Sequence, residues 1–242
     1  CMVGTMYASS ALYPLTCKPE DMMAQMRTRR LTHYYSDVMM NGCYPYFARM
    51  MWKDNGFTIQ MEDDDEAMLA AYPLDFISIS YYRSTTVNKD SIISPIGLCM
   101  DTNPYLKATP WGWPLDPLGL RYILNELYDR YNKPIMVVEN GLGEIDEFVN
   151  NTVDDYRINY LSDHFKAMHD AIVLDGVNCI GYTMWAPIDL VSMSTGEMKK
   201  RYGFVYVDMD DKGNGTRNRY KKKSFEWIKK VYTTNGASLS EE

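Results

Sequence analysis

The stretch Pro134-Ile-Met-Val-Val-Glu139-Asn-Gly141 decides the fold class. An apolar run of strand length ends in a carboxylate, and the turn residues Asn-Gly follow at once. A strand that carries Glu139 into a glycine-containing loop is typical of the carboxyl edge of an α/β fold, where parallel strands collect catalytic groups. The plain alternative is that Glu139 caps the loop that follows it.

Strands and helices alternate on both sides of this stretch. Further strands are predicted over residues 74–81 and 177–185, with the end of a strand and its following loop over residues 1–10 and a β-hairpin around residues 205–215. Helices are predicted over residues 19–40, 63–71, 116–131 and 224–232, and over a segment that ends at Gly176. Residues 83–109 form a long, mostly irregular stretch, and loops of that length tend to be functional. The alternation predicts a parallel sheet, either in a (β/α)8 barrel or doubly wound.

Composition excludes several classes of protein. The 242 residues, interpreted as a single domain over 1–242, carry a net charge of −7, which argues against a nucleic acid partner. No apolar run approaches the length of a membrane span, so no contact with a membrane is expected. Five scattered Cys and three His show no ligand spacing. They predict reduced thiols in a cytoplasmic protein, with no metal site and no cofactor.

Two clusters lie beyond the strand predicted at 177–185. The first is Trp185-Ala-Pro-Ile-Asp189, and the second is Ser192-Met-Ser-Thr-Gly-Glu-Met-Lys-Lys-Arg-Tyr-Gly203. Together with the Glu139 motif they resemble the C-terminal half of a family 1 glycoside hydrolase, specifically its 6-phospho-β-glucosidases. The resemblance covers essentially the whole chain. It implies the C-terminal portion of a TIM barrel, about strands 5 to 8 with their helices.

The same resemblance implies that Glu139 is the nucleophile of a retaining glycosidase. Retaining hydrolysis uses two carboxyl groups about 5 Å apart. The family's acid/base Glu lies in an Asn-Glu-Pro motif that does not occur here, because Asn125-Glu126 is followed by Leu127 within a predicted helix. The acid/base is therefore expected upstream of this chain, and the isolated chain is expected to be inactive.

Three aromatic residues match the family's sugar site. Tyr82 matches the Tyr that hydrogen-bonds and orients the nucleophile, in a motif where Ser80 replaces the usual Asn. Trp113 resembles a loop Trp that borders the sugar subsites, and Trp185 matches the Trp that floors the glycone subsite. Packing is the alternative for each of them, and for Trp111 core packing is the preferred interpretation.

The second cluster resembles the family's phosphate clamp, a Ser followed by a Lys and by a Tyr two residues later. Lys200 and Tyr202 match the Lys and the Tyr, and either Ser192 or Ser194 matches the Ser. An ammonium with neutral donors suits a phosphate oxyanion. The alternative is a solvated Lys-Lys-Arg surface loop. The neighbouring Lys199 and Arg201 are expected to be solvated or structural.

The implied function is cleavage of 6-phospho-β-glucosides, either a phosphorylated disaccharide or an aryl β-glucoside 6-phosphate, to glucose 6-phosphate. One alternative is a 6-phospho-β-galactosidase, whose members usually carry a Trp at the position of Met193. Another is a non-catalytic half-barrel that binds sugar phosphates. A half-barrel has unpaired strand edges, so a homodimer or association with its own N-terminal half is expected.

Overall fold

Four parallel strands form the central sheet of the chain, for which a computed structural model describes residues 1–95, 97–99, 101–146 and 153–240. The strands are β1 (Gly4–Ser9), β3 (Phe76–Tyr81), β5 (Ile135–Glu139) and β7 (Cys179–Tyr182), and they lie in that order. The order follows the chain without reversal, as in a barrel, whereas a doubly wound sheet reverses at a switch point.

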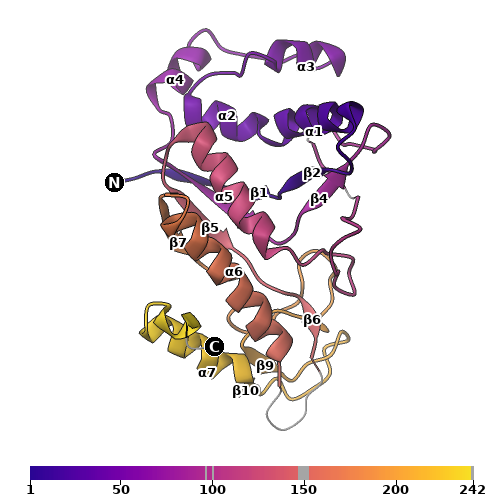
Figure 1. The fold of residues 1–242 in the computed structure, drawn as a ribbon, viewed down its shortest axis with the longest axis vertical. Helices are drawn as coiled ribbons and strands as arrows, with labels where there is room; N and C mark the ends of the chain where they lie inside the picture. Colours follow the sequence, from indigo (N-terminus) through magenta and orange to yellow (C-terminus); the bar gives the residue numbers. More distant parts are fainter. Residues whose placement is uncertain (96, 100, 147–152, 241–242) are drawn as a thin grey trace.

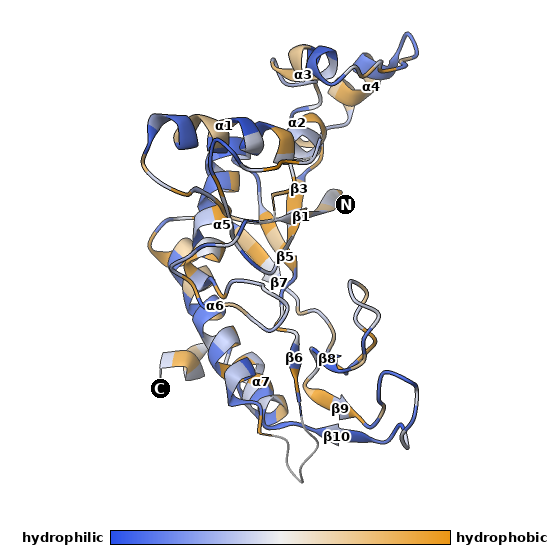
Figure 2. Ribbon diagram, turned by 90° about the vertical axis from the view of Figure 1, so that its right-hand side faces the viewer, coloured by the Kyte–Doolittle hydropathy of each residue, from blue (hydrophilic) through white to orange (hydrophobic). Residues whose placement is uncertain are grey.

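Helices separate the strands (Figure 1). Between β1 and β3 lie α1 (Pro19–Thr32), α2 (Tyr34–Asn41), α3 (Ala48–Asp54) and α4 (Asp65–Ala71). The later helices are α5 (Pro117–Tyr131), α6 (Asp155–Val173), α7 (Lys223–Thr233) and the 3-10 turn η1 (Ala237–Ser240). Figure 2 shows α5 and α6 together on one side of the strands.

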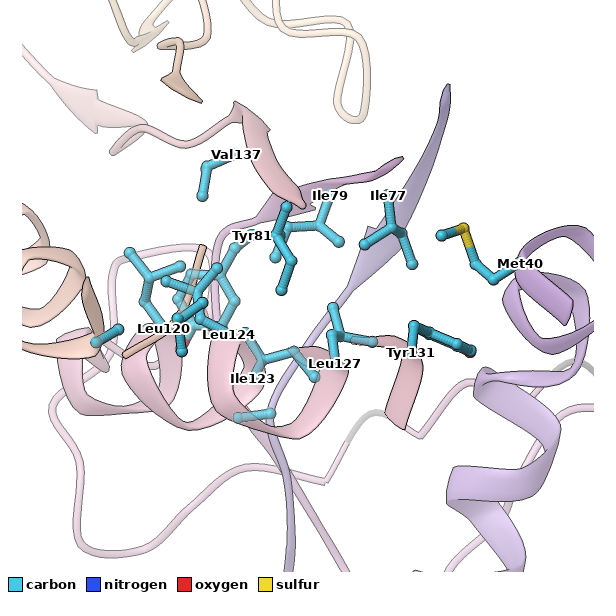
Figure 3. Close-up of a cluster of buried hydrophobic side chains, with 14 residues drawn as sticks. Met40, Ile77, Ile79, Tyr81, Leu120, Ile123, Leu124, Leu127, Tyr131 and Val137 are labelled. Carbon is cyan, nitrogen blue, oxygen red and sulfur yellow. The ribbon is translucent and has the colours of Figure 1, made fainter. Parts of the chain in front are cut away.

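The main core lies between α5 and the sheet (Figure 3). The helix begins at the predicted point, because Asp116 accepts a hydrogen bond from the Gly119 amide at 2.8 Å. The helical spacing of α5 then places four predicted apolar residues on the face toward the strands. Each is fully or almost fully buried: Leu120, Ile123, Leu124 and Leu127. Burying a side chain of this size is worth about 1.5–3 kcal/mol, so this face fixes the helix on the sheet.

The helix predicted over residues 19–40 is interrupted. His33 ends α1 and precedes α2 with backbone angles outside the helical range. Its side chain lies 2.7 Å from Glu126 of α5, and the Ser36 hydroxyl donates to its carbonyl at 3.0 Å. These contacts compensate for the broken helix. The predicted end is confirmed, because Gly42 has the left-handed φ of +67° that suits a C-terminal cap.

The strand predicted over residues 177–185 is shorter than expected. It ends at Tyr182. Beyond it the Thr183 amide still donates to the Val137 carbonyl, and the Trp185 amide donates to the carbonyl of Asn140, past the end of β5. The described residues of the stretch 83–109 include the short strand β4 (Thr85–Val87), which pairs with β2 (Leu12–Pro14). None of the helices in the described ranges is both long and apolar enough to cross a membrane.

Short strands at the carboxyl edge complete the fold. The predicted hairpin is confirmed by β9 (Val205–Val207) and β10 (Arg219–Lys221), which pair antiparallel. A two-residue ladder joins β6 (Glu144–Ile145) to β8 (Lys200–Arg201). This ladder places the segment after Glu139 against the segment predicted to bind phosphate.

Candidate active site

Glu139 is the last residue of β5 and lies at the carboxyl edge of the sheet. Its Oε2 accepts hydrogen bonds from the Ser80 hydroxyl at 2.8 Å and from the Tyr82 hydroxyl at 3.2 Å. Burial and the adjacent charge of Glu139 raise the pKa of Tyr82 well above its ordinary value, so the phenol remains a donor. The predicted contact between Tyr82 and Glu139 is therefore present, and Ser80 adds a donor that was not predicted.

Asn140 anchors the end of β5. Its fully buried side-chain amide donates to the Tyr81 carbonyl at 2.6 Å and to the Tyr160 hydroxyl at 2.9 Å, and it accepts from Tyr182. These partners belong to β3, α6 and β7, so one amide ties four elements together directly behind Glu139. Such support restricts the orientations that a working carboxylate can adopt.

Lys200 is buried among aromatic rings. The residue is only 1% exposed. Its Nζ lies 4.0 Å from the ring centre of Trp113, 5.0 Å from that of Trp111 and 5.9 Å from that of Tyr202. Within the described residues Nζ has no hydrogen-bond partner. Ring faces attract a cation without neutralising it. Burial lowers the pKa of Lys200, and the ammonium is left for an anion to approach.

Contacts connect Lys200 to Glu139. Trp113 lies against the ammonium on one side, and its ring centre is 5.6 Å from that of Tyr82 on the other. Tyr82 in turn donates to Glu139. The structure thus brings together four residues that the sequence identified separately, namely Tyr82, Trp113, Glu139 and Lys200. The first and last of them are 118 positions apart in the sequence.

Trp111 is not a core residue, contrary to the sequence interpretation. It is half-buried, its indole Nε1 donates to Glu197 at 3.0 Å, and its ring forms one wall around Lys200. Lys199 lies 2.6 Å from Glu197, and together with the Trp111 bond it holds the pKa of Glu197 at about 2. Residue type alone cannot distinguish a core Trp from a wall of a site. The spacing Trp-Gly-Trp was the only available signal.

Ser192, Ser194 and Tyr202 lie at the same edge. The two serine hydroxyl oxygens are 3.3 Å apart, with Ser192 buried and Ser194 exposed. The Tyr202 hydroxyl interacts with Ser192, and burial raises the pKa of Tyr202. Both serines remain candidates for the hydroxyl of the clamp.

Trp185 lies three residues beyond β7 rather than on that strand. Trp185 and Tyr202 both flank Gly141 in the loop after Glu139, because a Cβ placed on Gly141 would lie 3.7 Å from the Cβ of Trp185 and 3.7 Å from Cδ1 of Tyr202. All the sequence-predicted site residues therefore gather at one edge of the sheet.

Two other predictions concern residues outside this group. Arg201 is structural as expected, because it is buried and pairs with Asp189 at 3.1 Å. Glu126 is held in α5 by Arg29 and His33 at 2.6 and 2.7 Å, which is a structural role. In the described part of the chain no three His, Cys, Asp or Glu side chains are arranged to hold a metal.

Comparisons with known proteins agree with this geometry. The family model for glycosyl hydrolase family 1 matches residues 1–237. The aryl-phospho-beta-D-glucosidase BglH of Bacillus subtilis is 50% identical over 98% of this chain and 52% of its own length. The 6-phospho-beta-glucosidase AscB of Escherichia coli is 47% identical over 98% of this chain and 51% of its own length.

Solved structures give the same picture. The GH1 beta-glucosidase of Exiguobacterium antarcticum B7 aligns with a TM-score of 0.82 at 27% identity, over 98% of this chain and 52% of its own. The family 1 beta-glucosidase of Thermotoga maritima aligns with a TM-score of 0.78 at 26% identity, over 96% and 50%. The predicted fold, a portion of a TIM barrel, is confirmed, and the chain spans about half the length of the curated relatives it matches. This chain belongs to glycosyl hydrolase family 1.

Proposed function

We propose that this chain carries the nucleophile and the phosphate clamp of a retaining 6-phospho-β-glucosidase. The observation that carries the proposal is the buried ammonium of Lys200, which has no hydrogen-bond partner among the described residues and lies against Trp113. Trp113 and Tyr82 connect it to the carboxylate of Glu139. A sugar with an anion at one end and an anomeric carbon at the other fits that pair of groups. The names of the relatives BglH and AscB support the same substrate class.

In the first step Glu139 attacks the anomeric carbon, the bond to the aglycone oxygen breaks, and a glycosyl ester forms. The hydroxyls of Ser80 and Tyr82 hold Oε2 and keep the carboxylate oriented for attack. The aglycone leaves with a proton from a second carboxyl group about 5 Å away, which then activates water to hydrolyse the ester. We assign that second group to the half of the relatives that this chain does not span.

The phosphate is placed on Lys200, with the Tyr202 hydroxyl and a serine hydroxyl from Ser192 or Ser194 as neutral donors. Trp113 and Trp185 border the sugar ring. Met193, which is 88% exposed, stands between the two serines and supports a glucoside over a galactoside. Glucose 6-phosphate is the product. Such phosphorylated substrates belong in the cytoplasm, which suits five free cysteines.

Covalent trapping tests the proposal without the missing acid/base. A 2-deoxy-2-fluoro-β-glucosyl fluoride releases fluoride without needing a proton donor, and the ester to the nucleophile is then slow to hydrolyse. We expect the 6-phosphate of this reagent to label the chain once, on the peptide that contains Glu139, as read by intact-mass and peptide mass spectrometry. The same reagent without phosphate should label far more slowly.

Two variants serve as controls. Glu139→Gln should abolish labelling by both reagents, whereas Lys200→Gln should slow only the phosphorylated reagent. Equal labelling rates for both reagents in the wild-type chain would contradict the phosphate clamp. Labelling that persists in Glu139→Gln would contradict the nucleophile.

A further inference from the structure

Six charged side chains are buried together beneath the predicted phosphate clamp. Three are basic and three acidic, and none is more than 8% exposed: Arg157, Arg201, Lys222, Asp146, Asp154 and Asp189. Lys222 pairs with Asp146 and, at 2.8 Å, with Asp189, which also pairs with Arg201. The cluster is balanced in charge, as buried ions require.

Arg157, in the first turns of α6, is the centre of this cluster and is fully buried. Its Nη1 donates to the carbonyl of Leu142 at 2.6 Å and to the carbonyl of Tyr202 at 2.9 Å. Its Nη2 donates to the carbonyl of Arg201 at 3.3 Å. Leu142 lies three residues beyond Glu139, so one guanidinium joins the nucleophile loop to the clamp strand.

The backbone alone holds these two segments together only weakly. The ladder between β6 and β8 contains two residue pairs, Glu144 with Arg201 and Ile145 with Lys200. A ladder of this length is far shorter than an ordinary strand. The bonds of Arg157 to carbonyls on both segments therefore add the cross-link that the ladder does not supply.

Stability alone is a weak reason for so many buried charges. Replacing a buried ion network by well-packed apolar side chains is often neutral or stabilising. A planar guanidinium with five donors has a different use, because it can hold several acceptors in fixed directions. Asp146 at 3.2 Å and Asp154 at 3.0 Å hold the other donors of Arg157, which fixes the plane of the fork.

We propose that Arg157 is a positioning residue that sets the separation between Glu139 and the phosphate clamp. The inference rests on the proposed function, because it assumes that Lys200 and Tyr202 bind the phosphate. A phosphorylated sugar is anchored at both ends, so a small change in this separation misplaces one of them. A sugar without phosphate is anchored at one end only, so its affinity does not depend on the separation between Glu139 and the clamp.

The test compares the affinity of the chain for glucose 6-phosphate and for glucose by NMR titration, well below the unfolding temperature of each variant. Arg157→Lys keeps the charge and removes the fork, and we expect it to weaken glucose 6-phosphate binding at least about tenfold while glucose binding changes less than about twofold. Arg121→Lys is the matched control, because Arg121 of α5 pairs with Asp175, two residues beyond the end of α6, at 2.6 Å. It should change neither affinity.

A double-mutant cycle separates positioning from general damage. In the Lys200→Gln background, Arg157→Lys should cause no further loss of glucose 6-phosphate affinity, because the group it positions is already gone. If Arg157→Lys does not fold, Asp146→Asn takes its place, and it should weaken glucose 6-phosphate binding by a smaller factor without affecting glucose. A lowered melting temperature with unchanged glucose 6-phosphate affinity would overturn the proposal.

A wrong proposed function would give a different result from a wrong role of Arg157. The wild-type chain would bind glucose and glucose 6-phosphate with equal affinity, and Lys200→Gln would change neither affinity. A phosphate preference that Lys200→Gln removes and Arg157→Lys keeps would overturn the role of Arg157 alone.

Discussion

Neutral donors orient the carboxylate of Glu139. Ser80 and Tyr82 both donate to the same oxygen, and neither brings a charge next to the group. Hydrogen bonds to a charged acceptor are worth about 1.5–3 kcal/mol each, which is enough to hold one rotamer of Glu139. The cation of Lys200 is kept apart, with Trp113 and Tyr82 between it and the carboxylate. An ion pair between the two would occupy both of the groups to which we assign the proposed phosphorylated substrate.

Gly143 packs closely against two residues of the proposed clamp. A Cβ at this position would lie 2.7 Å from Cζ of Tyr202 and 2.9 Å from Cε of Lys200, closer than real Cβ atoms approach. We expect Gly143→Ala to displace both side chains and to weaken glucose 6-phosphate binding roughly tenfold, with glucose binding preserved, in the same NMR titration. Gly141→Ala is the control, because its Cβ would meet nothing closer than 3.5 Å. Equal effects of the two substitutions would contradict this account.

The residues that sequence reasoning found are those whose motif is local. Glu139 ends a strand before a turn, and Lys200 and Tyr202 are two positions apart. The residues that it missed depend on remote partners. Trp111 donates a hydrogen bond to Glu197, which lies 86 positions away in the sequence, and Arg157 donates one to Tyr202, which lies 45 positions away. Such pairs follow from the way the carboxyl-edge loops come together, which no short window of sequence contains.

Elements were predictable where one strong pattern governs them. Helix α5 follows its apolar period from the Asp116 cap to Tyr131 and has the predicted bounds. The break between α1 and α2 lies at His33, whose side chain contacts Glu126 of α5, a tertiary contact that helical propensity does not predict. The two-residue strands β6 and β8 carry no periodic signal. Propensity therefore predicts the framework, while tertiary contacts decide the interruptions and the short ladders at the site.

Helix α6 contains a histidine that should make the chain sensitive to acid. His164 is buried, and its Nδ1 lies 2.7 Å from the Tyr160 carbonyl, so the neutral ring donates there. Its Nε2 has no partner among the described residues. Burial lowers the pKa of His164 from 6.5 to about 4. Between these values the unfolded chain binds a proton that the folded chain does not, so stability is full above the higher value and falls as the pH drops toward the lower one.

His164→Gln should remove this acid-dependent loss of stability, which is about 3.5 kcal/mol for the shift from 6.5 to about 4 at roughly 1.4 kcal/mol per pKa unit. Urea unfolding at a series of pH values between neutral and about pH 4 measures it. His169→Gln in the same helix is the control, because that side chain is 66% exposed and should leave the pH dependence unchanged. An identical pH dependence in wild type and His164→Gln would show that the buried ring does not govern the effect.

At the scale of the whole molecule, the described helices α5 and α6 cover one side of the sheet. The side chains that alternate toward α5 are fully buried, as Ile77 and Ile79 are. On the opposite side Met6 of β1 is 54% exposed and Ile180 of β7 is 49% exposed. These two strands are also the outer ones, and in the described part of the chain each pairs with one neighbour in this sheet. Apolar side chains beside an unpaired edge favour association with another chain.

We therefore expect the isolated chain to associate in solution, either with itself or with a polypeptide that supplies the half of the barrel it does not span. Size-exclusion chromatography with light scattering over a wide concentration range measures this. Ile180→Lys places a charge on the edge strand and should shift the population toward monomer. Leu118→Lys replaces a residue that is 66% exposed on α5, away from both edges, and should not shift the population.

Adding the unspanned half of a relative such as BglH should convert the self-associated wild-type chain to a one-to-one complex, because a closed barrel has no free edges. A wild-type chain that stays monomeric at every concentration and ignores the added half would contradict the half-barrel account.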